Sequence, residues 1–259
     1  MQKSFDVLQS QDISETVTAI EWINSAGQQP TMLASNSRQT KLFKIVTKQV
    51  KKCESAKKKL VKGKGLAMPK TKVVSESKEG KHFYTYKTGN EAHIHSLTMC
   101  PDHENFINAD DNIVNLWNIE RPGKNPVYNL IDYERRKAVD DDEIITSTKF
   151  SCTQNTFLYT TSKGHIRVCD LRESSNFQHR PSVEFNVMAA HAKRAGSQFD
   201  KFLMNVSDAK FVPGSDHLIA SRDYIYTKLW DMRMGANSNS SHTGMIVDSV
   251  SSASPLFMA

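Results

Sequence analysis

Carboxylates gather at two places in this sequence where they could attract a positively charged ligand. Asp110 and Asp111 lie on a predicted turn just before a Leu-Trp strand, and Asp140–Glu143 precede another strand. Adjacent side chains on a strand point to opposite faces, so at most one of Asp110 and Asp111 should face a given ligand. Composition alone favours the alternative that both groups are solvated, with the Asp pair capping nearby backbone groups.

Other residue types that could do chemistry lack the spacing that a site needs. His93 and His95 form a His-x-His pair with no third ligand nearby, which favours structural histidines over a metal site. The four cysteines are far apart and form no Cys-x-x-Cys pair, which favours reduced, buried thiols. The Gly63–Gly65 segment lacks the phosphate-loop spacing, and no Ser-His-Asp or paired-carboxylate arrangement stands out. We therefore expect no enzyme activity, no cofactor and no metal.

The net charge of +6 is concentrated in one segment. Between Lys48 and Lys87 stand thirteen lysines, three glutamates and no arginine, which give this segment +10 and leave −4 for the rest of the chain. We expect the basic segment to bind an acidic partner and the acidic body to bind a basic one. Five of its lysines are the candidate residues for binding that acidic partner: Lys57, Lys58, Lys59, Lys62 and Lys64.

A hydrophobic strand-like stretch occurs four times, and an aliphatic-aromatic or similar pair follows it 18 to 21 residues later. The openings are Val17–Trp22, Ile94–Met99, Ile145–Phe150 and Val206–Phe211, and the closings are Leu42-Phe43, Leu116-Trp117, Val168-Cys169 and Leu229-Trp230. A fixed interval between such segments indicates repeats of four-stranded units, and a Trp-Asp ending is typical of WD repeats. The predicted fold is all-β, an incomplete WD-repeat propeller with four consecutive blades centred on 14–45, 92–119, 143–172 and 204–233.

The four blades define the predicted domain organisation. Residues 1–234 form the partial propeller, with a lysine-rich insertion at 46–89 that contains strand candidates and could form a protruding hairpin. Residues 235–259 are a low-complexity tail. No apolar run approaches the ~18 residues of a membrane span, and the first residues lack the apolar core of a secretory signal. We expect a cytoplasmic protein, with or without a nuclear pool, and no membrane partner.

Several segments, read in order, resemble one known family. They are Phe5–Ser10, His93–Leu97, Ala109–Trp117, Asn155–Arg172, Ser207–Phe211, Ser221–Tyr224 and Lys228–Asp231. The chain resembles the B-type (fifty-five kilodalton, WD-repeat) regulatory subunits of protein phosphatase 2A, and Cys169 at a usual Trp position is itself a trait of that family. The resemblance covers about residues 5–234, which correspond to blades two to five of the family's seven.

The resemblance implies a regulatory and targeting subunit that binds a helical-repeat scaffold subunit, a catalytic subunit and phosphoprotein substrates with basic motifs. It implies that Asp111, with Asp110, helps hold basic substrate residues. The family meets helical substrate motifs through a Leu and a Val, and this chain has Asp141 and Ile144 there. The insertion falls where the family has a hairpin arm that grips the scaffold.

An alternative function rests on the lysines alone. Clustered cations could contact phosphates, so the chain could be a nucleic-acid-binding protein or a general WD-repeat scaffold acting through the insertion. Aromatic stacking partners there are limited to Phe83, Tyr84 and Tyr86, and arginine is absent, which disfavours nucleic acid as a partner. A nuclear-import signal within 51–64 is a third interpretation of the same lysines.

Overall fold

The computed structural model describes residues 8, 10, 13, 15–23, 29–53, 71–87, 93–123, 125–133, 143–151, 155–172, 181–187, 205–215, 217–224 and 226–235. Within these residues the regular structure is fifteen strands and one short helix, α3 (Met232–Gly235). The strands are antiparallel to their neighbours and follow sequence order within each sheet. The fold is therefore all-β, as predicted.

Four sheets follow one another along the chain and correspond to the four predicted units. The first contains β1 (Val17–Ile23), β2 (Thr31–Asn36), β3 (Gln39–Cys53) and β4 (Thr71–Lys87). The second contains β5 (Ser96–Met99), β6 (Asn105–Ala109), β7 (Ile113–Asn118) and β8 (Tyr128–Asp132). The third contains β9 (Ile145–Phe150), β10 (Thr156–Thr161), β11 (His165–Asp170) and β12 (Val183–Asn186). The fourth contains β13 (Asp208–Phe211), β14 (Leu218–Arg222) and β15 (Thr227–Asp231).

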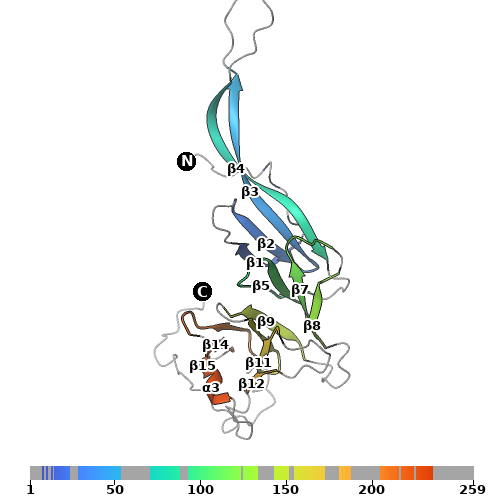
Figure 1. Cartoon of the computed structure of the whole chain (residues 1–259), viewed down its shortest axis with the longest axis vertical. Coiled ribbons are helices and arrows are strands. Elements are labelled where there is room, and N and C mark those ends of the chain that lie inside the picture. The colour runs from blue at the N-terminus through green and yellow to red at the C-terminus, as the bar shows by residue number, and fades with distance from the viewer. Residues whose placement is uncertain are drawn as a thin grey trace, which may run out of the picture.

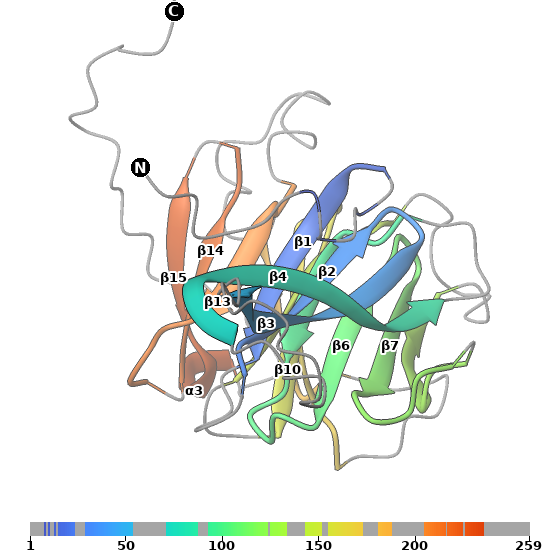
Figure 2. The ribbon, with the colours of Figure 1, turned by 90° about the horizontal axis from the view of Figure 1, so that it is seen from above.

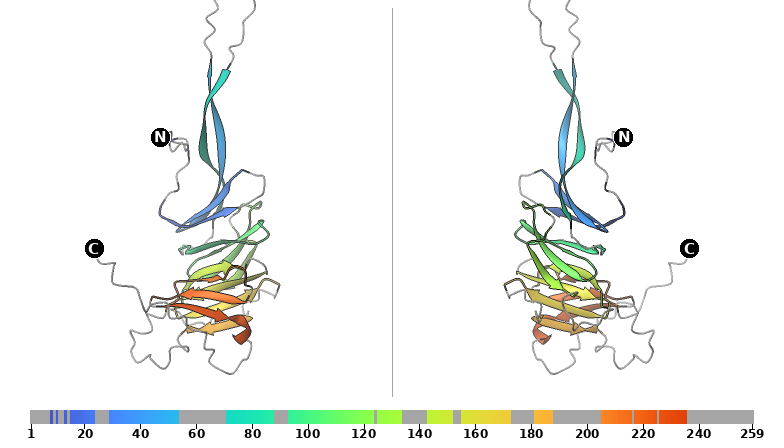
Figure 3. Two further views of the ribbon diagram at one scale, coloured as in Figure 1. Left: turned by 90° about the vertical axis from the view of Figure 1, so that its left-hand side faces the viewer. Right: turned by 90° about the vertical axis from the view of Figure 1, so that its right-hand side faces the viewer.

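The sheets pack face to face as consecutive blades (Figures 2 and 3). Three apolar clusters fill the three spaces between neighbouring blades, and their largest side chains are aromatic. Ring pairs such as Tyr86 with Trp117, whose centroids are 5.7 Å apart, join one blade to the next. The first strand of each blade contacts the first strand of the next, so β1, β5, β9 and β13 are the inner strands.

The recurring Trp of the closing segments is held by a buried hydrogen bond. Trp117 Nε1 donates to Oδ1 of Asn108 at 2.9 Å, and Trp230 Nε1 donates to Oγ of Ser221 at 2.8 Å. Both indoles are almost completely buried, so each N–H needs an acceptor within the protein. In two blades, therefore, the Trp of the closing segment is at a position where a buried indole with a hydrogen-bond acceptor is needed.

The lysine-rich insertion contains the predicted hairpin, and part of that hairpin belongs to the first blade. Strands β3 and β4 pair from Gln39 with Lys87 to Cys53 with Thr71. Their ends nearest the body complete the first blade, while their other ends extend away from it as an arm (Figure 1). The unit predicted at 14–45 therefore takes its fourth strand from inside the predicted insertion. The repeat pattern did not assign β4 to the first unit because the arm separates β4 from the main part of β3 in sequence.

Candidate functional site

Asp111 lies on the turn between β6 and β7, at the junction of the second and third blades. Its Oδ1 atom is 2.5 Å from Nε2 of His95, which precedes β5, and its side chain is 31% exposed. Its backbone carbonyl accepts a hydrogen bond of 2.9 Å from the amide of Ile145, at the start of β9. The turn is therefore fixed to both blades, and part of the carboxylate remains open to solvent.

Asp110 has a different role from its neighbour. It is 1% exposed, and its Oδ1 accepts hydrogen bonds from the amides of Asn112 (3.0 Å) and Ile113 (2.6 Å). These contacts close the turn that carries Asp111, in the manner of an Asx turn. The buried position of this carboxylate does not support the prediction that Asp110 also contacts a substrate. Its effect on a ligand would come through the turn that it holds in place.

Ile144 stands beside Asp111 at the same junction. Its side chain is 42% exposed, and its backbone exchanges hydrogen bonds with Ser162: the Ile144 amide donates to the Ser162 hydroxyl and its carbonyl accepts from the Ser162 amide. Because the next residue, Ile145, bonds to the Asp111 carbonyl, the junction presents a partly exposed carboxylate near an exposed aliphatic side chain. This combination suits a ligand with a basic residue close to an apolar one.

A buried charged network supports this junction from the third blade. Arg167 Nη1 donates to Oε1 of Glu143 (3.1 Å) and to the hydroxyl of Tyr133 (2.6 Å), while its Nε donates to Oε1 of Glu184 (2.8 Å). Glu143 is 7% exposed and immediately precedes Ile144. Burial raises the pKa of Tyr133 well above its usual value, so the neutral phenol accepts the bond from Arg167. The network fixes the backbone from which Ile144 projects.

Glu184 completes the network at its solvent side. A hydrogen bond with His165 lowers the pKa of Glu184 to about 2, although partial burial opposes this shift, and Arg167 adds to the lowering. The carboxylate is therefore ionised at any ordinary pH.

Across the part of the chain that the structure describes, no group of three or more His, Cys, Asp or Glu side chains could hold a metal ion. Among those same residues, no helix has the length and apolar character needed to cross a lipid bilayer.

The fold and the sequence both match known proteins. No family model matches the chain. The chain is 31% identical over 239 residues to the "Protein phosphatase PP2A 55 kDa regulatory subunit" of Drosophila melanogaster, a match that covers 89% of this chain and 46% of the relative. It is 30% identical over 241 residues to the mouse B gamma isoform of the serine/threonine-protein phosphatase 2A 55 kDa regulatory subunit, covering 90% and 52%. The resemblance to the B-type regulatory subunits is confirmed.

The match has a defined extent and structural counterpart. The chain spans about half the length of these B-type relatives, including a protein phosphatase PP2A regulatory subunit of Candida tropicalis, at 28% identity over 89% of this chain and 46% of the relative. Among solved structures, Raptor of Chaetomium thermophilum superposes with a TM-score of 0.54 at 13% identity, covering 86% of this chain and 16% of Raptor. This likeness supports the fold, an incomplete WD-repeat propeller. The names of the B-type relatives do not favour the nucleic-acid-binding alternative.

The structure describes only some of the residues that the B-type resemblance singled out, and their roles stay predictions. It brings Asp111 and Ile144 together and buries Asp110, while Asp141 lies outside the described residues. The five candidate scaffold-binding lysines, Lys57, Lys58, Lys59, Lys62 and Lys64, also lie outside them. Sequence reasoning missed the pairing of His95 with Asp111. The clue was available, because His95 immediately precedes the strand that pairs with the strand leading to Asp111.

Proposed function

We propose that the chain is a non-catalytic regulatory component of a protein phosphatase 2A complex, which it directs to phosphoprotein substrates with basic motifs. The supporting observation is the similarity over 89% of the chain to proteins named as phosphatase regulatory subunits. The Asp111–Ile144 junction gives this role a chemical basis, because an exposed carboxylate beside an exposed aliphatic side chain suits a Lys/Arg-rich motif that also carries apolar residues.

Substrate capture is tested at Asp111 with a Lys/Arg-rich peptide and calorimetry. Asp111→Ala should weaken binding by about fivefold or less, because one partly exposed charge pair contributes only about 0.2–1 kcal/mol. Asp111→Lys adds repulsion to the lost attraction and should weaken binding about tenfold. Glu76→Lys is the matched control, since it makes the same charge change at an exposed position on the arm. Equal affinity of wild type and Asp111→Lys would refute the capture role.

Scaffold docking is proposed for the arm. In the described part of the arm Lys51, Lys52 and Lys72 are exposed and the strands extend beyond the first blade, so their charge is available to an acidic surface. Lys57, Lys58, Lys59, Lys62 and Lys64 would add to it. Deleting the whole 46–89 segment would remove β4, the outer strand of the first blade. A cleaner variant replaces residues 50–75 by Asn-Gly and joins Gln49 to Glu76, which are paired in the hairpin.

The arm-shortened protein should fail to co-purify with the helical-repeat scaffold and catalytic subunits, yet bind the Lys/Arg-rich peptide as wild type does. Changing the five lysines Lys57, Lys58, Lys59, Lys62 and Lys64 to Gln keeps the chain length and isolates the contribution of charge. Full scaffold binding by the arm-shortened protein would contradict the docking role. Loss of peptide binding in that protein would contradict the separation of the two roles.

A further inference from the structure

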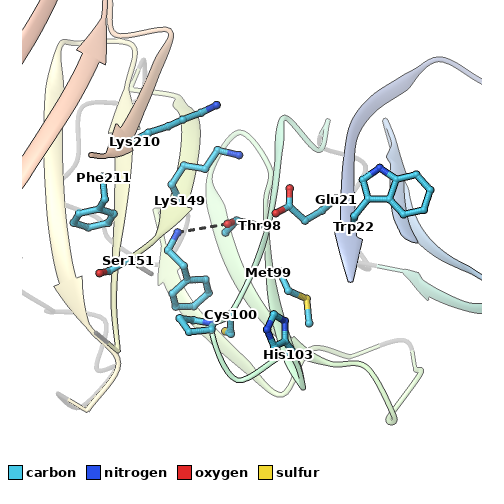
Figure 4. Close-up of a pocket in the computed structure, with 12 residues that line it drawn as sticks. Glu21, Trp22, Thr98, Met99, Cys100, His103, Lys149, Ser151, Lys210 and Phe211 are labelled. Carbon is cyan, nitrogen blue, oxygen red and sulfur yellow. Dashed lines mark hydrogen bonds between the residues drawn. The ribbon is translucent and has the colours of Figure 1, made fainter. Parts of the chain in front are cut away.

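The opposite end of the inner strands contains a cavity that the proposed substrate site does not use. It has a volume of about 500 Å³ and is lined by the C-terminal ends of β1, β5, β9 and β13, with the residues that follow β5 and β9 (Figure 4). Asp111 lies beside the N-terminal ends of β5 and β9 instead. A volume of this size falls within the range of ligand sites.

One position of the repeat lines this cavity in all four blades. The next-to-last residue of each opening segment is Glu21, Thr98, Lys149 or Lys210, and all four line the cavity. Lys149 and Lys210 come from adjacent inner strands, and Figure 4 shows their side chains extending in similar directions. Glu21 projects from the first blade on the other side. The cavity therefore has a basic side and an acidic side.

The basic side is available to a ligand. The Lys210 side chain is 65% exposed, and its ion pair with Oδ2 of Asp208 is a long one of 3.9 Å. The hydroxyl of Ser147 donates to the other oxygen of Asp208 at 2.7 Å. An exposed pair at that distance contributes little, so an incoming carboxylate can replace Asp208. Phe150 and Phe211, both mostly buried, also line the cavity, and we call them its phenylalanine wall.

A second cavity of about 580 Å³ lies beside the first, and His103 lines both. It lies between the first two blades, and Glu104, Glu120, Lys44 and Tyr84 are among its lining residues. Asp102 also lines it, but its Oδ1 accepts hydrogen bonds from the backbone amides of Glu104 and Asn105 within its own turn. We call the two adjoining cavities together the groove: lysines line the one at the inner strands, and carboxylates are among the residues that line the one between the blades.

We propose that this groove binds an extended, mixed-charge peptide segment of a partner protein. An acidic residue of the peptide lies between Lys149 and Lys210, an apolar residue contacts the phenylalanine wall, and the chain then passes Trp22 on the first blade. A basic residue lies over Glu104 and Glu120. The opposite charges of the two adjoining cavities favour an extended chain, which can reach both, over a compact anion.

The experiment uses the full chain and its own fluorescence. The protein has three tryptophans, of which Trp117 and Trp230 are buried and Trp22 is 52% exposed on the cavity wall, so Trp22 is the residue that an occupant would cover. End-blocked Asp-Glu-Leu-Gly-Ser-Lys-Lys and its reversed sequence are titrated, since the groove does not fix the chain direction. One of them should give a saturable blue shift of the emission, and Trp22→Phe should abolish that shift.

Charge variants decide the outcome. Lys149→Glu with Lys210→Glu should weaken binding about tenfold or more, whereas Lys72→Glu with Lys78→Glu on the arm leaves it unchanged. The peptide with Asn-Gln in place of Asp-Glu should bind as weakly as the double variant does. Asp111→Lys should have no effect, which separates this proposal from substrate capture. No saturable shift with either peptide, or equal affinity of the Lys149/Lys210 variant and wild type, would overturn the proposal.

Discussion

The two ends of the inner strands are built in different ways. At the Asp111 end the exposed groups stand on turns that a buried network of Arg167, Glu143 and Tyr133 holds in place. At the other end, lysines and two mostly buried phenylalanines line one cavity, and the contact that Lys210 makes with Asp208 is long and exposed. A charged network is sensitive to the loss of any member, while an exposed lysine can be changed with little effect on folding. The acidic end of the propeller should therefore be sensitive to substitution, while the basic end should accept substitutions with little loss of stability.

The sharpest way to break this comparison is to remove Arg167. The Arg167→Met variant leaves the carboxylate of Glu143 buried without its cation, so the free energy of unfolding should fall by about 3 kcal/mol or more. Lys149→Met, at the other end, should change it by no more than about 0.5 kcal/mol. Urea denaturation of both variants measures the two values. Similar losses would show that the two ends do not differ in this respect.

Tyr133→Phe should have the next largest effect. It removes the acceptor of a 2.6 Å hydrogen bond from Arg167 in a buried position, and bonds to charged groups contribute about 1.5–3 kcal/mol. Most of that cost should vanish when Arg167 is already Met, because the two residues act through one contact. Tyr128→Phe, at a side chain that is 60% exposed, provides the control. Additive losses in the double variant would argue against the network.

Acid should weaken the Asp111 end through Glu184. Its pKa lies near 2 in the folded protein, below the ordinary value of 4.5, so its stabilisation is complete above pH 4.5 and is lost as pH falls toward 2. Solvent screening limits the effect to less than about 1 kcal/mol, because the side chain is 42% exposed. Urea unfolding across this range should show a smaller pH dependence in Glu184→Gln than in wild type. An equal pH dependence of the unfolding free energy in Glu184→Gln and wild type would show that Glu184 does not contribute to acid sensitivity.

The smallest expected effect is between the two ends. Lys149→Glu with Lys210→Glu should change the affinity of the Lys/Arg-rich peptide at Asp111 by less than about twofold. A six-residue strand such as β9 spans roughly 20 Å, while screening at physiological salt acts over about 8 Å. Calorimetry at low and physiological salt tests this separation. A large change at physiological salt would mean that the ends are coupled through the blades.

The sequence predicted the blades because their periodicity reflects packing. An opening strand occurs in each of the four blades, and a closing aliphatic-aromatic or similar pair follows it, with Trp in two of them, so their spacing located all four sheets. Alternation on a strand also predicted that Asp110 and Asp111 face different surroundings. The buried network was not predictable, since Tyr133, Glu143 and Arg167 are separated in sequence and meet only through blade packing. The groove was missed because Lys149 and Lys210 look like ordinary strand lysines until the repeats are superposed.

The hairpin makes the first blade a natural place to divide the chain. The outer strand β4 is held to β3 by backbone pairing along its whole length, and its buried Tyr86 packs against Trp117 of the next blade. These contacts lie within 39–53 and 71–87 and in the next blade. Two polypeptides, 1–53 and 71–259, should therefore associate by strand addition and restore the blade. The protein could thus serve as a split reporter whose reassembly signals that its two halves have met.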